Sequence, residues 1–531
     1  MFLRQAWMSL GDNVAYMLSY LCLAAIPLLV GLVAQEPAPQ NLNYIVNGGF
    51  ENGLTGWTVS GDAGIEKELP IAGGSSLRLG PGKGAVSQQY AMAGLHVVEF
   101  AATARLSSDK VKAIVRVQCL DANGHVVMDL KQPFAPKETS KPQGGSAKIY
   151  FKTHALTKSV LVSIEKTTAS SGFVVADYVE LHDNDHDWKA HTPTCDLAEY
   201  MHPIWHGDRV VDESVLLLSA NGGAAAGKLL FKPRRILSLT NTDLSTTFKE
   251  GLDFVVDGRT IVAKTDSAIP VVRDSEIPKL EFPWLSVAGR HVLVTYEHDD
   301  PWQGPIPPFC GDQLPRTLEK LKSHRPVTIV AYGDSITQGI DVSGYRQAPP
   351  YMPTWPDLVA WQLKKVYGYD GIKLFNASLG GMTSWWAADN ARDAVGSLKP
   401  DLVFVGFGMN DFWSVSPAEF RTNIEGTMTA VRSRSPKAEF ILISSIRFDP
   451  AYTADPTYVG HMTGYHDALK TLAGKGVCLL DLTALSEYLY AVKSAKDLLA
   501  DPMHPDDFFA RLFAQCAVQM LEVPNMGKRV N

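Results

Sequence analysis

The sequence VTIVAYGDSITQG, at residues 327–339, decides the fold of the C-terminal part of this chain. It opens with a short, nearly continuous apolar run, and Gly333-Asp334-Ser335 follows at once. Short apolar runs bounded by turn residues are typical of strands buried on both faces, as in parallel sheets. Reactive groups gather at the carboxyl ends of such strands, so Ser335 stands where a nucleophile is expected.

Four further apolar runs follow, at residues 372–375, 402–407, 440–444 and 477–482, and helix-length segments separate them. This alternation predicts an α/β domain over residues 320–523, in which helices cover both faces of a parallel sheet. The motif G-x-S-x-G occurs nowhere in the chain, which disfavours an ordinary α/β-hydrolase.

Two glycine-rich blocks follow the second and third predicted strands. They read NASLGGMTS at residues 376–384 and GFGMND at residues 406–411. Glycine lets a backbone amide approach a substrate closely, and an asparagine side chain supplies a neutral N–H donor for a developing oxyanion. Taken alone, each block is also explained as a simple turn.

A fourth block, DPMHP at residues 501–505, precedes an apolar helical segment at 508–521. A serine nucleophile needs a neutral imidazole to take its proton and a carboxylate to fix the imidazole tautomer. Asp501 and His504 stand three residues apart on one turn and can meet that need. Taken alone, His504 is also explained as a helix-capping or loop histidine.

Together, and in this order, the four blocks resemble those of the SGNH (GDSL-type) hydrolase family, and the resemblance covers the whole of residues 320–523. It implies that Ser335 is the nucleophile, His504 the general base and Asp501 the residue that orients His504. It also implies an oxyanion hole formed by the Ser335 amide, Gly381 and Asn410. Acyl transfer of this kind requires no cofactor and no metal.

The choice of Gly381 over Gly380 rests on the family's second block, which spaces its glycine five residues after the asparagine, here Asn376. The resemblance further implies a three-layer α/β/α architecture for this domain.

The first region, residues 43–184, alternates apolar and polar residues at period two, which predicts a β-sandwich. Its opening NGGFE at 47–51 and its closing ADYVEL at 176–181 resemble the ends of jelly-roll carbohydrate-binding modules. Some such modules hold calcium near these ends, so Glu51 and Asp177 are candidate ligands, with plain surface carboxylates as the alternative.

A second region, residues 203–300, contains short strand-like runs at 215–219, 236–240, 254–257 and 291–297. It predicts a small β-domain, so that two β-sandwich-type domains precede the α/β domain, as in some multidomain carbohydrate acetyl esterases. The connector before it, residues 182–191, is rich in His and Asp. We interpret it as a solvated linker rather than a metal site, because its spacing fits no known ligand pattern.

The N-terminus, residues 1–40, carries an uncharged apolar run from Val14 to Ala34. It predicts a signal peptide, and hence a secreted, periplasmic or cell-surface protein, with an uncleaved signal-anchor as the alternative. Of six cysteines, Cys22 lies in this leader; the spacing of the others matches no zinc motif and leaves room for one disulfide. A net charge of −7 gives no basic face for nucleic acid.

The predicted substrate is an acetylated polysaccharide or oligosaccharide, because aromatic residues crowd the loops beside the catalytic blocks. The candidate sugar contacts are Trp355, Trp385, Trp386 and Trp413. The alternatives are a lipid or aryl-ester hydrolase, an acyltransferase with the same serine, and a glycan-binding surface protein whose hydrolase domain is vestigial. The sequence chooses neither the polysaccharide nor the oligomeric state.

Overall fold

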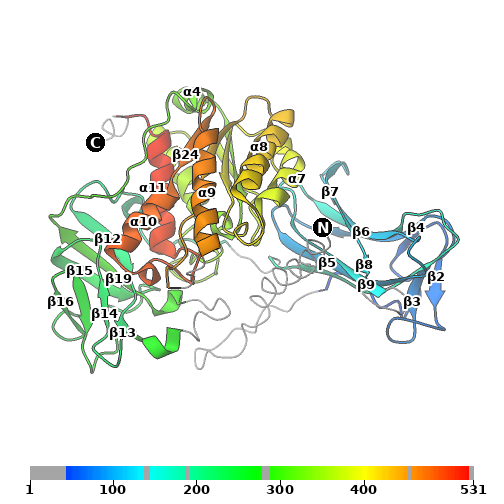
Figure 1. Cartoon of the computed structure of the whole chain (residues 1–531), viewed down its shortest axis with the longest axis horizontal. Coiled ribbons are helices and arrows are strands. Elements are labelled where there is room, and N and C mark those ends of the chain that lie inside the picture. The colour runs from blue at the N-terminus through cyan, green and yellow to red at the C-terminus, as the bar shows by residue number, and fades with distance from the viewer. Residues whose placement is uncertain (1–42, 137–143, 186–189, 278–286, 452–455, 525–531) are drawn as a thin grey trace. The chain divides into compact units, whose positions relative to one another are not determined.

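The computed structural model describes residues 43–136, 144–185, 190–277, 287–451 and 456–524 (Figure 1). The predicted leader lies outside these residues. The chain divides into two compact units, one of residues 34–188 and the other of the remaining chain. Among the described residues, no helix is both long enough and apolar enough to cross a membrane.

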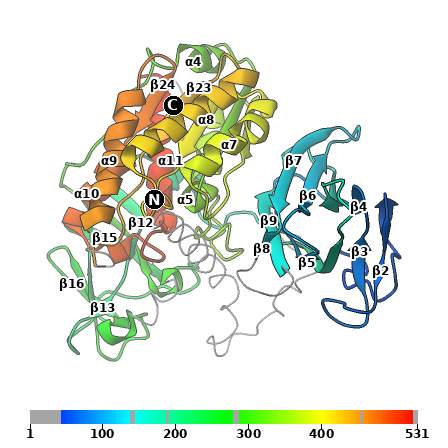
Figure 2. The same cartoon turned by 45° about the vertical axis from the view of Figure 1, so that its right-hand side comes forward.

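The first unit is a sandwich of two antiparallel sheets (Figure 2). One sheet has the order β1(Thr58–Ser60), β4(Gly84–Ala91), β10(Ser159–Lys166), β6(Ala113–Leu120) and β7(Val126–Pro133). The other has the order β2(Ala63–Glu66), β3(Ser76–Leu79), β11(Val174–Asp183), β5(Val97–Leu106), β9(Gly144–Lys152) and β8(Ala135–Pro136). Alternate residues such as Val115 and Val117 are fully buried between the sheets, which confirms the period-two prediction.

The second unit begins with two smaller sheets. Strands β12(Arg209–Val215), β19(Val292–His298) and β15(Pro233–Asn241) form an antiparallel sheet of three. The other sheet has the order β16(Phe254–Asp257), β17(Thr260–Ala263), β14(Ala226–Lys228), β13(Leu218–Ser219) and β18(Val272–Arg273). The run predicted at 215–219 is divided: β12 ends at Val215, β13 begins at Leu218, and the two residues between them, Leu216 and Leu217, are buried.

The α/β part of the second unit has an all-parallel sheet of five strands. Its order is β21(Ile372–Asn376), β20(Val327–Gly333), β22(Leu402–Gly406), β23(Glu439–Ile443) and β24(Val477–Leu480). After β20 the chain adds β21 on one side of it, and then returns to add β22, β23 and β24 on the other side. The strand order therefore reverses at β20, and ligands of open α/β sheets bind at the carboxyl ends of the strands at such a point.

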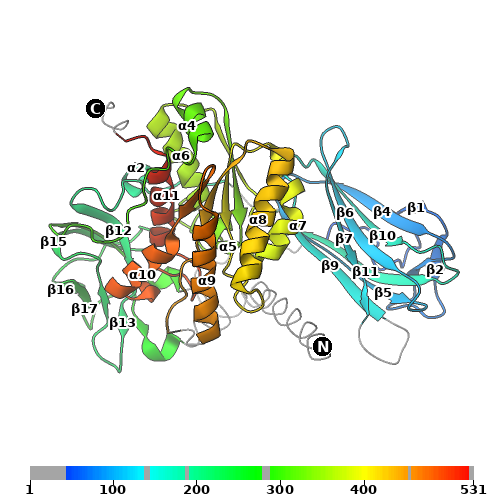
Figure 3. The ribbon, with the colours of Figure 1, turned by 45° about the horizontal axis from the view of Figure 1, so that its top comes forward.

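Helices cover this sheet (Figures 1 and 3). They are α6(Trp355–Tyr367), α7(Ser384–Ala394), α8(Pro417–Arg434), α9(Pro456–Leu472), α10(Leu482–Val492) and α11(Asp507–Leu521). Helix α8 packs between α7 and α9, whereas α6 packs against α11. The five strands and the α11 helix follow the predicted segments to within two residues, and the α/β prediction is confirmed.

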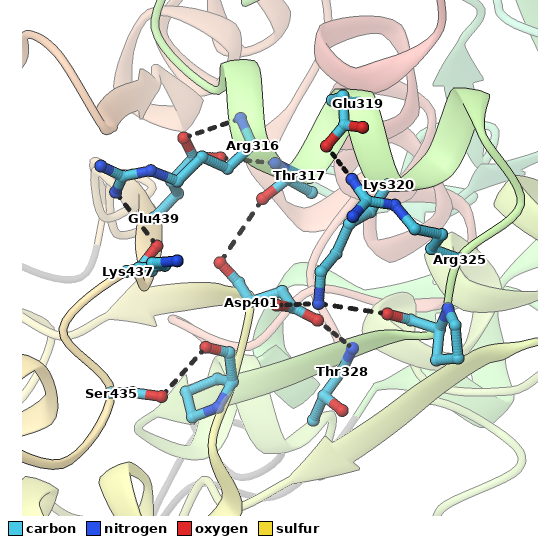
Figure 4. A network of polar contacts seen from close by, with 12 residues as sticks. Arg316, Thr317, Glu319, Lys320, Arg325, Thr328, Asp401, Ser435, Lys437 and Glu439 are labelled. Atoms are coloured by element: carbon cyan, nitrogen blue, oxygen red, sulfur yellow. Dashed lines mark hydrogen bonds and ion pairs between the residues drawn. The ribbon is translucent and has the colours of Figure 1, made fainter.

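Two carboxylates, the buried Glu439 and the partly exposed Asp401, fasten the amino-terminal edge of the sheet (Figure 4). Glu439, 1% exposed at the start of β23, accepts the backbone N–H groups of Arg316 and Thr317 at 3.1 and 2.8 Å. These are the first free donors of helix α4(Pro315–Lys322). Asp401 accepts from Lys320 Nζ at 2.6 Å and from the Thr328 amide at 3.0 Å. This end of the sheet is a structural anchor, opposite the end that carries the chemistry.

Candidate active site

Ser335 lies directly after β20, as the first residue of the one-turn helix α5(Ser335–Gln338). Asp334 caps this turn through the Ile336 amide at 3.0 Å. A side chain at Gly333 would place its Cβ 2.3 Å from the Gly406 carbonyl oxygen, so glycine is required where β20 and β22 approach. Ser335 is buried, with 5% of its surface exposed.

The structure brings the three residues of the predicted triad together. Ser335 Oγ lies 2.7 Å from His504 Nε2, and His504 Nδ1 lies 2.7 Å from Asp501 Oδ2. The second carboxylate oxygen of Asp501 accepts the backbone N–H groups of Met503 and His504, each at 2.9 Å. With Nδ1 donating to Asp501, Nε2 is left to accept the serine proton, as general-base catalysis requires.

The charges around His504 favour its protonated form. Burial opposes protonation, but the charge and hydrogen bond of Asp501, with the charges of Asp341 and Asp334, raise the pKa of His504 to about 9. Burial also acts to raise the pKa of Asp501, but the His504 charge and hydrogen bonds outweigh it and hold that pKa below its usual range. The pair is therefore arranged to stabilise an imidazolium.

A second carboxylate, which the sequence did not indicate, lies beside the same imidazole. Asp341 Oδ2 is 3.4 Å from His504 Nδ1, and Asp341 Oδ1 is 3.7 Å from Arg346 Nη1. Asp341, Asp501 and His504 form the one group of metal-ligand type found among the described residues. Both nitrogens of His504 are already hydrogen-bonded to protein atoms, so we assign no metal to it.

The segment that carries Asp501 and His504 is a closed loop. The Ala500 amide donates to the His504 carbonyl at 2.8 Å, and the Asp506 amide donates to the Leu498 carbonyl at 3.0 Å. We call residues 498–506 the acid–base loop. Its two ends are joined by backbone hydrogen bonds, which fix the spacing between Asp501 and His504.

The small β-region braces the chain just before the acid–base loop. Lys493 Nζ lies 2.6 Å from Glu213 Oε1, and both side chains are completely buried. Asp497 Oδ1 accepts the Leu216 amide at 2.8 Å, and the Ser214 hydroxyl donates to the Asp497 carbonyl at 2.6 Å. These three contacts show that the 203–300 region has a structural role, which its sequence did not reveal: it supports the chain before the acid–base loop.

Two of the three predicted oxyanion donors, Gly381 and Asn410, lie on the turns that follow β21 and β22. Asn410 Nδ2 donates to the Met382 carbonyl at 3.0 Å, which ties the Asn410 turn to the glycine block. Gly381 has φ +77°, a conformation that favours glycine. The Gly380 amide donates to Gln338 Oε1 at 2.7 Å, and a Cβ at Gly380 would lie 3.6 Å from Ser335 Cβ. The glycine block therefore borders the nucleophile.

Two further residues position this end of the site. Asp411, fully buried, accepts the Ser384 hydroxyl at 2.5 Å and the Ser384 amide at 2.9 Å, which joins the Asn410 turn to the start of α7. Burial raises the pKa of Asp411 to about 6. Gln338 also donates to the Tyr345 hydroxyl at 2.8 Å.

Sequence reasoning missed the roles of Asp341, Gln338 and Asp411. Asp411 stands next to Asn410, and that adjacency was the one available signal. Asp341 and Gln338 stand on the turn after Ser335, and no spacing rule singled them out.

The predicted sugar contacts separate into two groups. The sugar contact predicted for Trp355 is wrong. This residue is 1% exposed, donates its indole N–H to the Ile336 carbonyl at 3.2 Å and packs against Phe404, so it cannot meet a substrate. Trp413 and Trp385 are exposed, by 71% and 50%. Trp386 is half-buried, with its ring centroid 5.7 Å from that of Tyr332.

Other predicted positions have ordinary partners. Asp177 accepts from the Ser76 hydroxyl at 2.8 Å and from the Ala72 amide at 3.1 Å, and Glu51 accepts the Gly74 amide at 2.9 Å. These contacts hold neighbouring loops of the sandwich. The described cysteines, Cys119, Cys195, Cys310, Cys478 and Cys516, are free thiols.

Residues 331–511 match the model of the GDSL-like lipase/acylhydrolase family. The chain carries a GDSL-like acylhydrolase domain. All four sequence blocks fall inside the matched residues, and the acylhydrolase domain has the parallel sheet described above.

Three solved structures are similar to parts of the chain. A catalytic mutant of an acetylxylan esterase from Geobacillus stearothermophilus is 19% identical over 37% of this chain and 94% of its own, with a TM-score of 0.32. A family 16 carbohydrate-binding module is 22% identical over 26% of this chain and 99% of its own, with a TM-score of 0.23.

The enzymatically active domain of a bacteriophage tailspike protein is 12% identical over 27% of this chain, with a TM-score of 0.23, and the chain spans 21% of its length. No curated protein is significantly similar in sequence to this chain.

Proposed function

We propose that this protein is a serine esterase that removes O-acetyl groups from a polysaccharide or oligosaccharide. The observation that carries the proposal is the hydrogen-bonded chain from Ser335 through His504 to Asp501 inside an acylhydrolase domain. Each link is 2.7 Å long, which is the length expected of a hydrogen bond that can pass a proton.

The proposed reaction has two half-steps. Ser335 Oγ attacks the ester carbonyl while His504 Nε2 takes the serine proton, and His504 then returns that proton to the departing sugar alcohol. Water, deprotonated by the same nitrogen, attacks the acetyl-serine and releases acetate. Asp501 stabilises the imidazolium in both half-steps.

The oxyanion of each tetrahedral intermediate would be stabilised by the amides of Ser335 and Gly381 and by the Asn410 side chain. Asn410 carries two N–H bonds on one nitrogen, and one of them is used on the Met382 carbonyl. That bond orients the amide group, and the second N–H is the one we assign to the oxyanion.

The carbohydrate part of the proposal is supported by the exposed tryptophans. Trp385 lies in the first turn of α7, four residues after Gly381, and Trp413 lies three residues after Asn410. Both are at least half exposed and stand beside the proposed oxyanion donors in sequence. An indole face suits the apolar face of a sugar ring. The resemblance of the first region to carbohydrate-binding modules and the predicted leader support this proposal, and we propose that the protein acts outside the cytoplasm.

The test is acetate release from a panel of acetylated polysaccharides, with the wild type, Ser335→Ala, and a chain that lacks residues 1–190. Ser433→Ala, which changes an exposed serine of α8, is the matched control. We expect release that requires Ser335, that Ser433→Ala leaves unchanged, and that the truncation weakens on the polymer but not on a small acetyl ester.

Other results point to the alternatives. Ser335-dependent cleavage of long-chain or aryl esters without acetate release from any glycan identifies a lipid or aryl-ester hydrolase. Transfer of the acetyl group to an added alcohol in preference to water identifies an acyltransferase. Glycan binding without any Ser335-dependent turnover identifies a vestigial hydrolase domain.

A further inference from the structure

His504 faces two carboxylates where the proposed mechanism uses one. Asp501 Oδ2 lies 2.7 Å from His504 Nδ1, and Asp341 Oδ2 lies 3.4 Å from the same nitrogen. Both acids are largely buried, with side chains 5% and 15% exposed. Two buried carboxylates at one imidazole nitrogen are more than a Ser-His-Asp triad needs.

Asp341 reaches this position from the nucleophile's side of the site. It follows the α5 turn, six residues after Ser335, whereas Asp501 belongs to the acid–base loop. The imidazole is therefore held by acids from two separate segments. A change that removes one of them leaves the other in place.

We propose that Asp341 is a positioning residue that shares the Nδ1 proton of His504 with Asp501 and holds the imidazole in its productive tautomer when Asp501 is replaced. This inference rests on the proposed serine-esterase function. In a well-studied protease, replacing the triad acid by Asn lowers turnover about 10⁴-fold because the imidazole takes the wrong tautomer. Here Asp341 remains to accept the Nδ1 proton.

The charges that face the pair agree with this role. Burial and the Asp501 charge raise the pKa of Asp341, while His504 and Arg346 act to lower it. Replacing Asp501 by Asn removes one of the causes that favour protonated Asp341, so Asp341 becomes a better acceptor in that variant. Asp334 is the remaining acid that acts on His504. It is kept partly protonated, because burial raises its pKa to about 7 and the charge of Asp411 also acts to raise that pKa.

The experiment compares Asp341→Asn, Asp501→Asn and the double variant by hydrolysis of p-nitrophenyl acetate, with Ser335→Ala as the baseline. We expect Asp501→Asn to lose about 10²-fold rather than the usual 10⁴-fold, and the double variant to lose at least about 10⁴-fold. Asp341→Asn alone should lose less than about 10-fold. It should also move the acidic limb of the kcat/KM profile to lower pH, because the Asp341 charge raises the pKa of His504.

Equal activity of Asp501→Asn and the double variant would overturn the proposal, because Asp341 would then contribute nothing when Asp501 is absent. Ser343→Ala in the Asp501→Asn background is the matched control: it disturbs the same turn through the Ser343 contacts with Asp507 and the Met352 amide, and it keeps both the Asp341 carboxylate and its Arg346 partner. If this control loses as much activity as the double variant, disturbance of the turn that carries Asp341, rather than loss of its carboxylate, is responsible for the effect. The proposal then fails.

A titration of His504 by NMR separates this inference from the esterase proposal. If the wild type shows no Ser335-dependent hydrolysis, the proposed function fails, but the His504 pKa should still fall in Asp341→Asn. An unchanged His504 pKa in a folded Asp341→Asn variant contradicts the role of Asp341 whatever the activity of the enzyme.

Discussion

At the base end of the site each side-chain nitrogen and oxygen of the Asp501–His504 pair has a protein partner, whereas at the oxyanion end protein acceptors orient donors that we assign to substrate. His504 bonds Ser335 and Asp501, and both oxygens of Asp501 are occupied. By contrast, Asn410 donates one N–H to the Met382 carbonyl, and the Gly380 amide, next to the assigned donor Gly381, donates to Gln338 Oε1. The side chains of the base end are therefore hydrogen-bonded to one another without substrate. At the oxyanion end, neighbouring protein groups orient the donors.

The difference follows from how each end is anchored. The acid–base loop is closed on itself by backbone hydrogen bonds and is braced from behind by the buried Lys493–Glu213 pair. The oxyanion end consists of two turns, joined to each other by the Asn410–Met382 and Asp411–Ser384 contacts. Substitutions at the two ends should therefore affect different properties of the enzyme.

The largest effect is expected on stability, from Lys493→Met. Removing one partner of a buried ion pair leaves an uncompensated charge on Glu213, which costs about 3–5 kcal/mol of unfolding free energy. Urea unfolding of the second unit measures this. The control is Lys320→Met, which removes the contact of Lys320 with Asp401 drawn in Figure 4. Because Asp401 is partly exposed, this variant should cost less than about 1 kcal/mol. Equal losses of unfolding free energy in the two variants would show that the buried Lys493–Glu213 pair stabilises the fold no more than the partly exposed pair does.

The next effect is on turnover, from Asn410→Ala. Loss of one oxyanion donor lowers kcat by about 10²–10³-fold in a well-studied protease, and we expect a loss of that size with little change in KM. Steady-state kinetics on a small acetyl ester measure it. Asn390→Ala is the control, since Asn390 also donates its side-chain amide to a backbone carbonyl, that of Trp386. A loss below about 10-fold in Asn410→Ala would remove Asn410 from the oxyanion hole.

The pH profile tests the base end without any substitution. Because the pKa of His504 is raised to about 9, the imidazole is protonated at neutral pH and becomes a base only as pH rises. We expect kcat/KM to climb with pH and to reach its midpoint above pH 7. The same shift stabilises the fold below about pH 6.5, and this contribution is lost as pH rises through 9. A midpoint at or below 6.5 would contradict the influence of the surrounding acids.

The smallest effect is expected from Trp413→Ala. This side chain is 71% exposed, so its removal should leave stability and small-ester hydrolysis unchanged. Aromatic ring pairs are worth about 0.5–1.5 kcal/mol, and with the same range for an indole stacked on a sugar, kcat/KM on an acetylated polymer should fall about 2–10-fold. Trp361→Ala on α6, which we assign no substrate contact, is the control. A loss on the small ester as large as on the polymer would show that Trp413 does not act through substrate.

Sequence patterns predicted the parts of this molecule in which one physical requirement dominates. Buried parallel strands must be continuously apolar, so β20 to β24 could be located from residues 327–482. Three of the four polar blocks follow β20, β21 and β22 for the same reason, the fourth lies in the loop before α11, and Ser335, Asp501 and His504 did come together.

Burial and long-range contacts could not be obtained in this way. Trp355 and Trp413 each lie close to a catalytic block in sequence, yet one lies in the core and the other is exposed. Asp341 meets His504 across 163 positions of chain, and Lys493 meets Glu213 across 280. Such contacts depend on how the turns after the strands fold, and neither periodicity nor local spacing encodes that.

The central claim is that Ser335 is a nucleophile activated by His504, and reaction with a fluorophosphonate tests it most directly. We expect intact mass spectrometry to show one adduct on the wild type and peptide mapping to place it on Ser335. Ser335→Ala should show no adduct, and His504→Ala should react far more slowly than the wild type. A wild type that forms no adduct would contradict the account. So would labelling of the wild type and of Ser335→Ala at the same rate on a residue other than Ser335.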